Sequence, residues 1–389
     1  LEPILSRTLG VPLFQEQLLR MAMVAAGFTG SEAEELRRAF GFKRSERRMA
    51  EVEVKLREGM ARQGITGPAA DEIVHQVTSF ALYGFPESHS SSFALLAYAS
   101  AYLKAHHGPA FYAALLNNQP MGFYHSATVV NDARRHDVRV LPVDVTRSDW
   151  PCTLERRDGA WAVRLGLRYV KGLRESAARA LVAARAARPF ASARDLAARA
   201  ELARDEMQTL AAIGALAPLG GTRRANVWNA AVPDLGPLFA PTTPAPSPLR
   251  EMTETERLVA DYAGTGVTLG PHPMALRRTA LAARGVRRAV DLAAGRDGER
   301  VRVAGSVIVR QRPGTAKGFV FLSLEDETGI ANVIVTPGLF ARRRWVLVGE
   351  PFLLVEGILQ RQDGVISVRA GRVEPLPRLE PAVPSHDFG

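Results

Sequence analysis

Tyr83-Gly84-Phe85-Pro86-Glu87-Ser88-His89-Ser90-Ser91-Ser92-Phe93-Ala94 leads directly into a helical pattern that ends near His107. Serine is a poor residue inside a helix but a good N-cap, so this cluster predicts that a helix begins here. The unpaired backbone N–H groups at a helix N-terminus favour anions, phosphate above all. For a serine cluster taken by itself, the alternative is a capped core helix beside a surface loop.

The residues upstream of this cluster are also helical in pattern. Gly10 to Gln17 leads into an apolar helix through Met23, and a cationic segment follows: Glu34-Glu35-Leu36-Arg37-Arg38-Ala39-Phe40-Gly41-Phe42-Lys43-Arg44. Taken in order with the serine–histidine cluster, these blocks resemble the fingers region of the bacterial DNA polymerase III alpha-subunit family. The ending Ser385-His386-Asp387-Phe388 resembles the tail of the damage-inducible, error-prone branch of that family.

The resemblance implies the carboxy-terminal part, fingers to tail, of an error-prone DNA polymerase used in translesion synthesis and mutagenesis. In the intact enzyme a primer 3′-hydroxyl attacks a dNTP, assisted by Mg2+. The family's metal-binding aspartates belong to the palm, upstream of these blocks. We therefore expect Mg2+ outside this segment, no catalytic or metal-binding residue within it, and no polymerase activity from it alone. Two alternatives remain: a non-catalytic DNA-binding module, and a fragment of the replicative polymerase III alpha subunit.

The charge balance favours a polyanionic partner. The 389-residue chain carries a net charge of +10 with a pI of about 10.2, and lysine supplies only five of its 50 basic residues. Guanidinium groups match phosphate bidentately. GC-rich coding would explain the choice of arginine over lysine but not the excess of bases over acids.

Cysteine content and hydropathy indicate a cytoplasmic protein without a membrane partner. Cys152 is the only cysteine, which excludes a disulfide framework and a thiolate zinc site. No apolar run reaches the length of a membrane span, and no signal peptide opens the chain. The chain begins at Leu1 rather than methionine, so we expect a truncated product or a fragmentary gene record.

The pattern predicts a multidomain, mainly α protein that ends in a β barrel. From Arg300 the apolar period changes to two, and five strand candidates with Gly-containing turns suit an OB-fold barrel. The predicted parts are a helical fingers region (1–120), a small mixed α/β connector (121–165), a helix-hairpin-helix domain (166–232), a Pro-rich linker (233–249), a helical connector (250–299), an OB-fold nucleic-acid-binding domain (300–376) and a tail (377–389).

The resemblance places a nucleotide site in the fingers region. Leu36-Arg37-Arg38-Ala39 matches the family's fingers motif, so we expect Arg37, Arg38, Lys43 and Arg44 to contact the dNTP triphosphate. Ser88, His89 and Ser90 would line the same pocket from the next helix. The alternative for the cations is a solvated helix face.

DNA contacts are expected in two turns that resemble helix-hairpin-helix motifs. In Val170-Lys171-Gly172-Leu173-Arg174 the glycine lets backbone N–H groups approach a phosphate, and Arg174 replaces the usual second glycine. Gly214 marks the second unit, with a helix C-cap as an equal alternative. We also expect Lys104 to contact DNA, although a core or scaffold role fits it equally well.

The barrel offers a third DNA-binding region. We expect Arg310, Arg312 and Lys317 in the first inter-strand loop to bind DNA, together with Arg361 in the last turn. Phe319 and Phe321 would stack bases, or else point into the barrel. The densest acidic cluster, Glu325-Asp326-Glu327, is predicted to consist of ordinary surface carboxylates.

Recruitment is expected to depend on other proteins. Replicative relatives carry a glutamine-led peptide that binds the sliding clamp, and Asp234-Leu235-Gly236-Pro237-Leu238-Phe239 lacks that glutamine. Clamp binding is therefore predicted to be indirect. The error-prone branch implies an accessory partner that resembles a Y-family polymerase.

Overall fold

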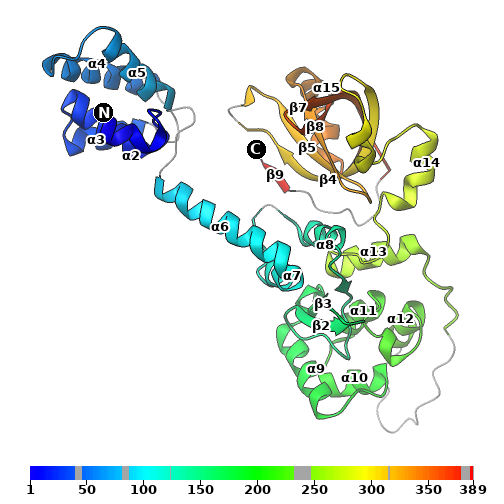
Figure 1. Cartoon of the computed structure of the whole chain (residues 1–389). Helices are drawn as coiled ribbons and strands as arrows, with labels where there is room; N and C mark the ends of the chain where they lie inside the picture. Colours follow the sequence, from blue (N-terminus) through cyan, green and yellow to red (C-terminus); the bar gives the residue numbers. More distant parts are fainter. Residues whose placement is uncertain are drawn as a thin grey trace. The chain divides into compact units, whose positions relative to one another are not determined.

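The computed structural model describes residues 1–39, 46–80, 87–122, 124–231, 247–313, 316–377 and 386–388. These divide into two compact units, Leu1–Tyr102 and Leu103–Gly389. Helices dominate both units, and a β barrel lies near the C-terminus of the sequence (Figure 1). This confirms the predicted fold class.

The first unit is entirely helical in its described part. Its amphipathic pattern is clearest in α2, where Leu18, Met21, Ala22 and Ala25 recur at helical spacing and are buried. The helices pack around one apolar core through these stripes. The elements are α1 (Glu2–Leu5), η1 (Ser6–Thr8), α2 (Gln15–Ala26), α3 (Gly30–Ala39), α4 (Glu46–Arg62), α5 (Pro68–Phe80) and the first part of α6 (Glu87–His106).

Helix α6 begins at Glu87, within the serine–histidine cluster, as predicted. The serines from Ser88 to Ser92 lie inside the helix rather than at its cap. Glu87 donates its backbone N–H to the Glu16 carboxylate at 2.9 Å, so an anion from the protein itself lies at this helix start.

A small sheet and helices begin the second unit. Strand β3 lies between β1, which it pairs in parallel, and β2, which it pairs antiparallel. Asp158 and Gly159 both have positive φ and close the β2–β3 hairpin, as a type I′ turn requires. The sequence predicted a small mixed α/β connector here, and of its three strands β2 is polar and half-exposed. The elements are α7 (Gly108–Asn117), α8 (Ser126–Arg135), β1 (Val140–Leu141), β2 (Thr153–Arg157) and β3 (Ala160–Arg164).

A helical region follows the small sheet. Its helices between Leu167 and Ala231 share with α7, α8 and β3 a core that contains Leu116, Leu167, Leu181 and Leu210. The elements are η2 (Leu167–Tyr169), α9 (Glu175–Ala187), α10 (Ala193–Ala200), α11 (Arg204–Ala212), η3 (Ala217–Leu219), α12 (Arg223–Ala231), α13 (Glu254–Thr265), η4 (Ala275–Arg277), α14 (Arg278–Ala283) and η5 (Ala289–Ala294).

Five strands form the closed barrel, in the order β5-β6-β8-β7-β4, with β4 also pairing β5. All are antiparallel neighbours except β6 and β8. The apolar-basic insert in the sequence is a helix, α15, between β6 and β7. The elements are β4 (Arg300–Gln311), β5 (Val320–Glu325), β6 (Ile330–Val335), α15 (Pro337–Gly349), β7 (Phe352–Gln362), β8 (Val365–Pro375) and β9 (His386–Phe388), which pairs in parallel with β4.

The prediction of ordinary surface carboxylates at the end of β5 is wrong for Glu325 and Asp326, which are each only 2% exposed. Glu325 accepts hydrogen bonds from Asn131 and Arg135 of α8. Asp326 accepts from several backbone N–H groups and from Arg278. Burial of a carboxylate is tolerated where donors replace water, and apart from the N–H groups of Thr328 and Gly329 these donors come from distant parts of the sequence.

Among the residues that the structure describes, no helix is both long enough and apolar enough to cross a membrane.

Candidate nucleic-acid interface

The turn around Gly172 leaves several backbone N–H groups exposed. Gly172 has φ +82°, and no described atom other than those of its chain neighbours lies within 4 Å of where a Cβ would stand. The first helical hydrogen bond of α9 runs from the N–H of Ala178 to the carbonyl of Arg174. No described acceptor takes the N–H groups of Gly172, Glu175 or Ser176, all of which are exposed. These donors can approach a phosphate closely.

Lys171 and Arg174 fix the position of this turn through backbone and side-chain hydrogen bonds. Lys171 donates its backbone N–H to the carbonyl of Gly264 at 2.7 Å and its Nζ to the carbonyl of Tyr262 at 2.9 Å, which ties the turn to the end of α13. Arg174 donates its backbone N–H and its guanidinium to Glu206, each at 2.9 Å. The two charged residues predicted to contact DNA therefore hold the loop in place.

Glu206, in α11, holds this turn through Arg174, and the sequence analysis did not identify it. Its side chain is buried and also accepts the N–H of Ala203 at 2.7 Å. Hydrogen bonds from Arg174 outweigh the effect of burial and lower the pKa of Glu206 to about 2. Its position three residues into α11 is a common site for a glutamate that caps a helix, but nothing local predicted the Arg174 partner.

The second turn, at Gly214, has the same φ angle at its glycine but different neighbouring groups. Gly214 also has φ +82°, one residue beyond the C-cap of α11, as the helix-end alternative requires. Its N–H is accepted by the carbonyl of Ala211. A Cβ here would stand 2.6 Å from Nε of Arg223, so the protein's own guanidinium occupies the approach.

An ion pair with Asp261 holds the Arg223 guanidinium beside Gly214. Nη1 of Arg223 donates to Asp261 at 2.7 Å, and the hydroxyl of Thr268 donates to the other carboxylate oxygen at 2.9 Å. Burial raises the pKa of Asp261 despite these bonds. Both residues line a cavity of about 310 Å³ between the hairpin helices and α13.

The fingers candidates lie in the first unit, partly outside the described residues. Arg37 pairs with Glu34 at 2.6 Å, and both side chains are well exposed. His89 is exposed and its ring lies 4.4 Å from that of Phe93, while the Ser90 hydroxyl donates to the carbonyl of Glu87. Arg38 and Ser88 are placed only as positions in α3 and α6. Lys43, Arg44 and the Leu238-Phe239 peptide fall outside the described residues.

Lys104 lies in a polar network of the second unit. Its Nζ donates to Asp132 at 2.8 Å, and the same carboxylate accepts the hydroxyl of Tyr112 at 2.7 Å. Burial pushes the pKa of Asp132 upward, but hydrogen bonds from Lys104 and Tyr112 outweigh it and leave the pKa lowered. This arrangement suits the scaffold alternative for Lys104.

The predicted DNA contacts of the barrel fall into two groups: guanidiniums that donate to main-chain carbonyls of the protein, and residues that are wholly or partly exposed. Arg310 was expected in the first loop, but it lies in β4, is 8% exposed, and donates to the carbonyls of Leu347 and Glu350. Arg361 donates to the carbonyls of Ala293 and Gly295. Both guanidiniums donate to main-chain carbonyls of the protein, those of α15 and the residue after it for Arg310 and those of the segment before β4 for Arg361.

The other barrel candidates face outward. Arg312 and Lys317 are exposed in the loop between β4 and β5. Phe321 is 37% exposed, between the buried Val320 and Leu322, so it points away from the core. Phe319 is half-buried just before β5. Arg312, Lys317 and Phe321 are therefore accessible from solvent, and Phe319 is partly so.

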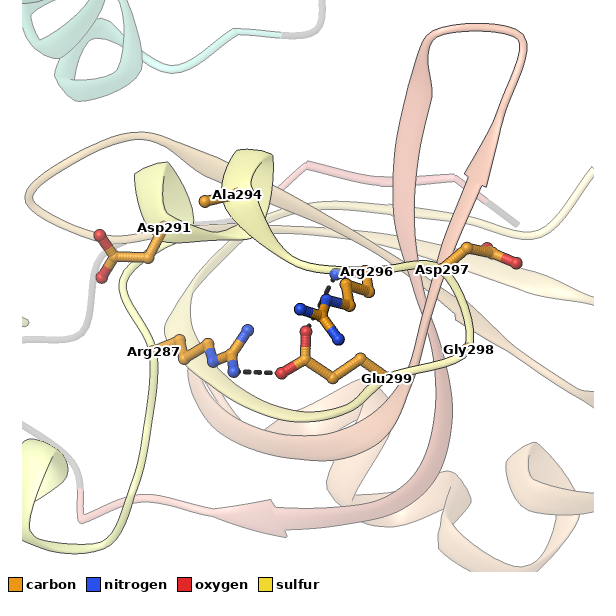
Figure 2. A pocket seen from close by; sticks show the side chains of 7 residues that line it. All are labelled: Arg287, Asp291, Ala294, Arg296, Asp297, Gly298 and Glu299. Atoms are coloured by element: carbon orange, nitrogen blue, oxygen red, sulfur yellow. Dashed lines mark hydrogen bonds and ion pairs between the residues drawn. The ribbon is translucent and has the colours of Figure 1, made fainter.

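A surface hollow of about 810 Å³ lies at the start of β4. Figure 2 shows Arg287 paired with Glu299, whose carboxylate also accepts the backbone N–H of Arg296. Asp291 and Asp297 line the same hollow. Its carboxylates offset its guanidiniums, so it lacks the uniform positive charge of an anion site.

The described residues contain no group of three or more His, Cys, Asp or Glu side chains that could hold a metal ion. Glu325, Asp326 and Glu327 fit a metal pair poorly, because hydrogen bonds and ion pairs with Arg135 and Arg278 already engage them. Burial raises the pKa of the Cys152 thiol to about 11, which keeps it protonated at neutral pH.

Comparison with known families matches three parts of the chain. Residues 1–64 match the bacterial DNA polymerase III alpha subunit finger domain, residues 137–226 a helix-hairpin-helix motif, and residues 301–376 an OB-fold nucleic acid binding domain.

Proteins named error-prone DNA polymerase align with nearly the whole chain. Those of Anaeromyxobacter dehalogenans (strain 2CP-C), Azoarcus sp. (strain BH72) and Burkholderia pseudomallei (strain K96243) are 49%, 51% and 47% identical over 97%, 96% and 97% of it. The alignments cover 34%, 36% and 36% of those proteins, so the chain spans about a third of their length. Over nearly its whole length the chain is similar to error-prone DNA polymerases, in a region whose first part matches the finger domain of the bacterial DNA polymerase III alpha subunit and whose last part matches an OB fold.

Proposed function

We propose that this chain is the part of an error-prone DNA-directed DNA polymerase that holds the primer-template, while the chemistry belongs to the rest of such a polymerase. The observation that carries the proposal is the Gly172 turn, where no described acceptor takes the exposed N–H groups of Gly172, Glu175 and Ser176 and no described neighbour crowds the Cβ position of Gly172. The net charge of +10 supports a polyanionic partner. The relatives' name supports translesion synthesis during DNA repair as the role of the whole protein.

The fingers residues are proposed to contact the incoming dNTP. Arg37 is paired, but only with an exposed carboxylate one turn away. Such surface pairs contribute about 0–1 kcal/mol, so a triphosphate can compete for the guanidinium. Arg38, Lys43, Arg44, Ser88, His89 and Ser90 are proposed for the same site from the resemblance of their motifs.

The metal and protein partners are proposed from the family. DNA polymerases use divalent metal ions, and Mg2+ held by carboxylates outside this chain would stabilise charge on the reacting phosphate. An accessory partner that resembles a Y-family polymerase would bring the protein to the primer, with the sliding clamp engaged indirectly. A cytoplasmic location fits a DNA partner.

The Gly172 turn can be tested by removing one N–H without removing a helix. Glu175 is the first residue of α9, where proline is tolerated, and the preceding residue is already extended. We expect Glu175→Pro to weaken binding of a fluorescent primer-template about fivefold in anisotropy titrations, because one hydrogen bond to a charged phosphate is lost.

Glu254→Pro is the matched control. It also replaces a glutamate at the first position of a helix, α13, which follows an extended N-cap. It should leave the affinity unchanged, and neither variant nor the unchanged chain should extend the primer when dNTPs and Mg2+ are added. Equal affinities for the two variants would contradict the proposed contact at the Gly172 turn.

A further inference from the structure

Helix α15 carries a group of charges that the proposed function does not use. Arg342, Arg343, Arg344 and Trp345 are consecutive and exposed, and Trp345 is 88% exposed. Tryptophan is usually largely buried, so such exposure needs an explanation. We call these four residues the α15 patch.

The three arginines of the patch differ from most surface arginines of this chain. Arg147, Arg179 and Arg288 each pair with a carboxylate within 3 Å. No described carboxylate lies within ion-pair distance of Arg342, Arg343 or Arg344. The patch therefore presents three uncompensated guanidiniums beside an exposed indole.

A local kink explains how all four residues can be exposed. Successive helical residues turn by about 100°, so a regular helix packed on a barrel would point at least one of four toward the core. Arg343 has φ −123° and ψ 22°, outside helical geometry. The kink keeps the patch outside, while Leu339 and Leu347 on either side are buried in the barrel.

The helix is held at both ends. The Thr336 hydroxyl accepts the N–H of Leu339 at the start of α15. At the other end Arg310 donates to the carbonyls of Leu347 and Glu350, at 2.7 Å and 2.5 Å. The guanidinium predicted to bind DNA thus positions the helix that carries the patch.

The helix that carries the patch contacts the predicted DNA-binding loop between β4 and β5. The guanidinium of Arg312 lies 4.8 Å from the ring centre of Phe340 in α15. Gly318 approaches the helix start so closely that its Cβ would stand 3.5 Å from Cγ of Pro337. The basic loop therefore packs against the first part of the helix that carries the patch.

We propose that the α15 patch binds single-stranded DNA, with its guanidiniums on phosphates and the Trp345 indole stacked on a base. Cations beside an exposed aromatic ring hold single strands in this way. Contact between α15 and the basic loop of an OB fold favours a nucleic acid over an acidic protein segment. The inference rests on the proposed function, in that it assumes a DNA-binding barrel.

The test compares variants of the whole chain on a fluorescent oligothymidylate. Trp345→Ala should weaken binding about tenfold at every salt concentration, and Trp345→Phe should recover most of it. The triple change Arg342→Ala, Arg343→Ala, Arg344→Ala should lower the slope of log affinity against log salt by about 2. Arg147→Ala, Arg179→Ala, Arg288→Ala removes the same charge from paired positions and should change the slope less.

Three results would overturn the proposal. The first is binding by the patch variants equal to that of the unchanged chain, which would refute the patch while leaving DNA binding intact. The second is tighter binding of poly-glutamate than of the oligonucleotide at the patch. The third is no DNA binding by the unchanged chain, which would refute the proposed function as well. An unchanged melting temperature checks that each variant is folded.

Discussion

The turns at Gly172 and Gly214 share a backbone angle but differ in what stands in front of them. Open space lies in front of Gly172, whereas the Arg223 guanidinium fills the approach to Gly214. A glycine with positive φ therefore leaves room for another group beside the backbone, but it does not show whether that group is a ligand or a side chain of the protein. In the first turn we propose a DNA phosphate, and in the second the protein supplies the contact itself.

The largest expected effect comes from removing the carboxylate of the second turn. Asp261→Ala leaves Arg223 unpaired and takes the acceptor from Thr268, which should cost about 3 kcal/mol of local stability. Hydrogen–deuterium exchange of the α11 and α13 peptides would report it. The double variant Arg223→Met, Asp261→Ala should recover part of the loss, because no charge is then left unpaired. Unchanged exchange in Asp261→Ala would show that the pair is dispensable.

Acid should change the stabilising effects of Glu206 at the first turn and Asp261 at the second turn in opposite directions. The pKa of Glu206 is lowered to about 2, so its stabilising effect is complete above its usual pKa of 4.5 and is lost as the pH falls toward 2. The pKa of Asp261 is raised by burial, so its charged form is penalised and protonation in acid relieves that penalty.

Glu206→Gln should therefore cost about 2 kcal/mol at pH 7, with the difference from the unchanged chain shrinking as the pH falls from about 4.5 to 2. Exchange of the α9 and α11 peptides at several pH values measures this. Glu175→Gln, which loses only an exposed pair with Arg179, is the control and should cost under about 0.5 kcal/mol. A difference that stays constant down to pH 2 would contradict the lowered pKa.

The smallest expected effects come from alanine substitutions at Gly172 and Gly214, and they test the comparison of the two turns most directly. Alanine at either glycine is strained by about 1 kcal/mol because φ is positive. Gly214→Ala should lose about 1 kcal/mol more stability, since its Cβ displaces Arg223, but should keep its affinity for primer-template DNA. Gly172→Ala should bind that DNA about fivefold more weakly, measured by anisotropy. Equal affinities would mean that neither turn contacts phosphate.

Sequence patterns predicted the elements well where the pattern is local. The period-two segments after Arg300 are the five barrel strands, and a helix does begin in the serine–histidine cluster. Strand β2 was missed because its residues are polar and half-exposed. Helix α15 was missed because its kink and its run of exposed cations hide the amphipathic pattern.

The candidate site was less predictable, because its partners are distant in sequence. The positions of Gly172 and Gly214 could be predicted, but Arg174 binds Glu206, 32 residues away, and Arg223 binds Asp261, 38 residues away. The burial of Glu325 depends on Arg135, 190 residues upstream. No local pattern carries such pairings, so the sequence could not tell which cations remain available for DNA.

The choice of arginine over lysine has a consequence for chemical modification. Only five of the 50 basic residues are lysines, and the amines of Lys104 and Lys171 already donate to Asp132 and to the carbonyl of Tyr262. Acylating reagents and lysine acetylation neutralise amines but leave guanidiniums charged. Most of the positive charge of this chain therefore lies beyond the reach of lysine acetylation.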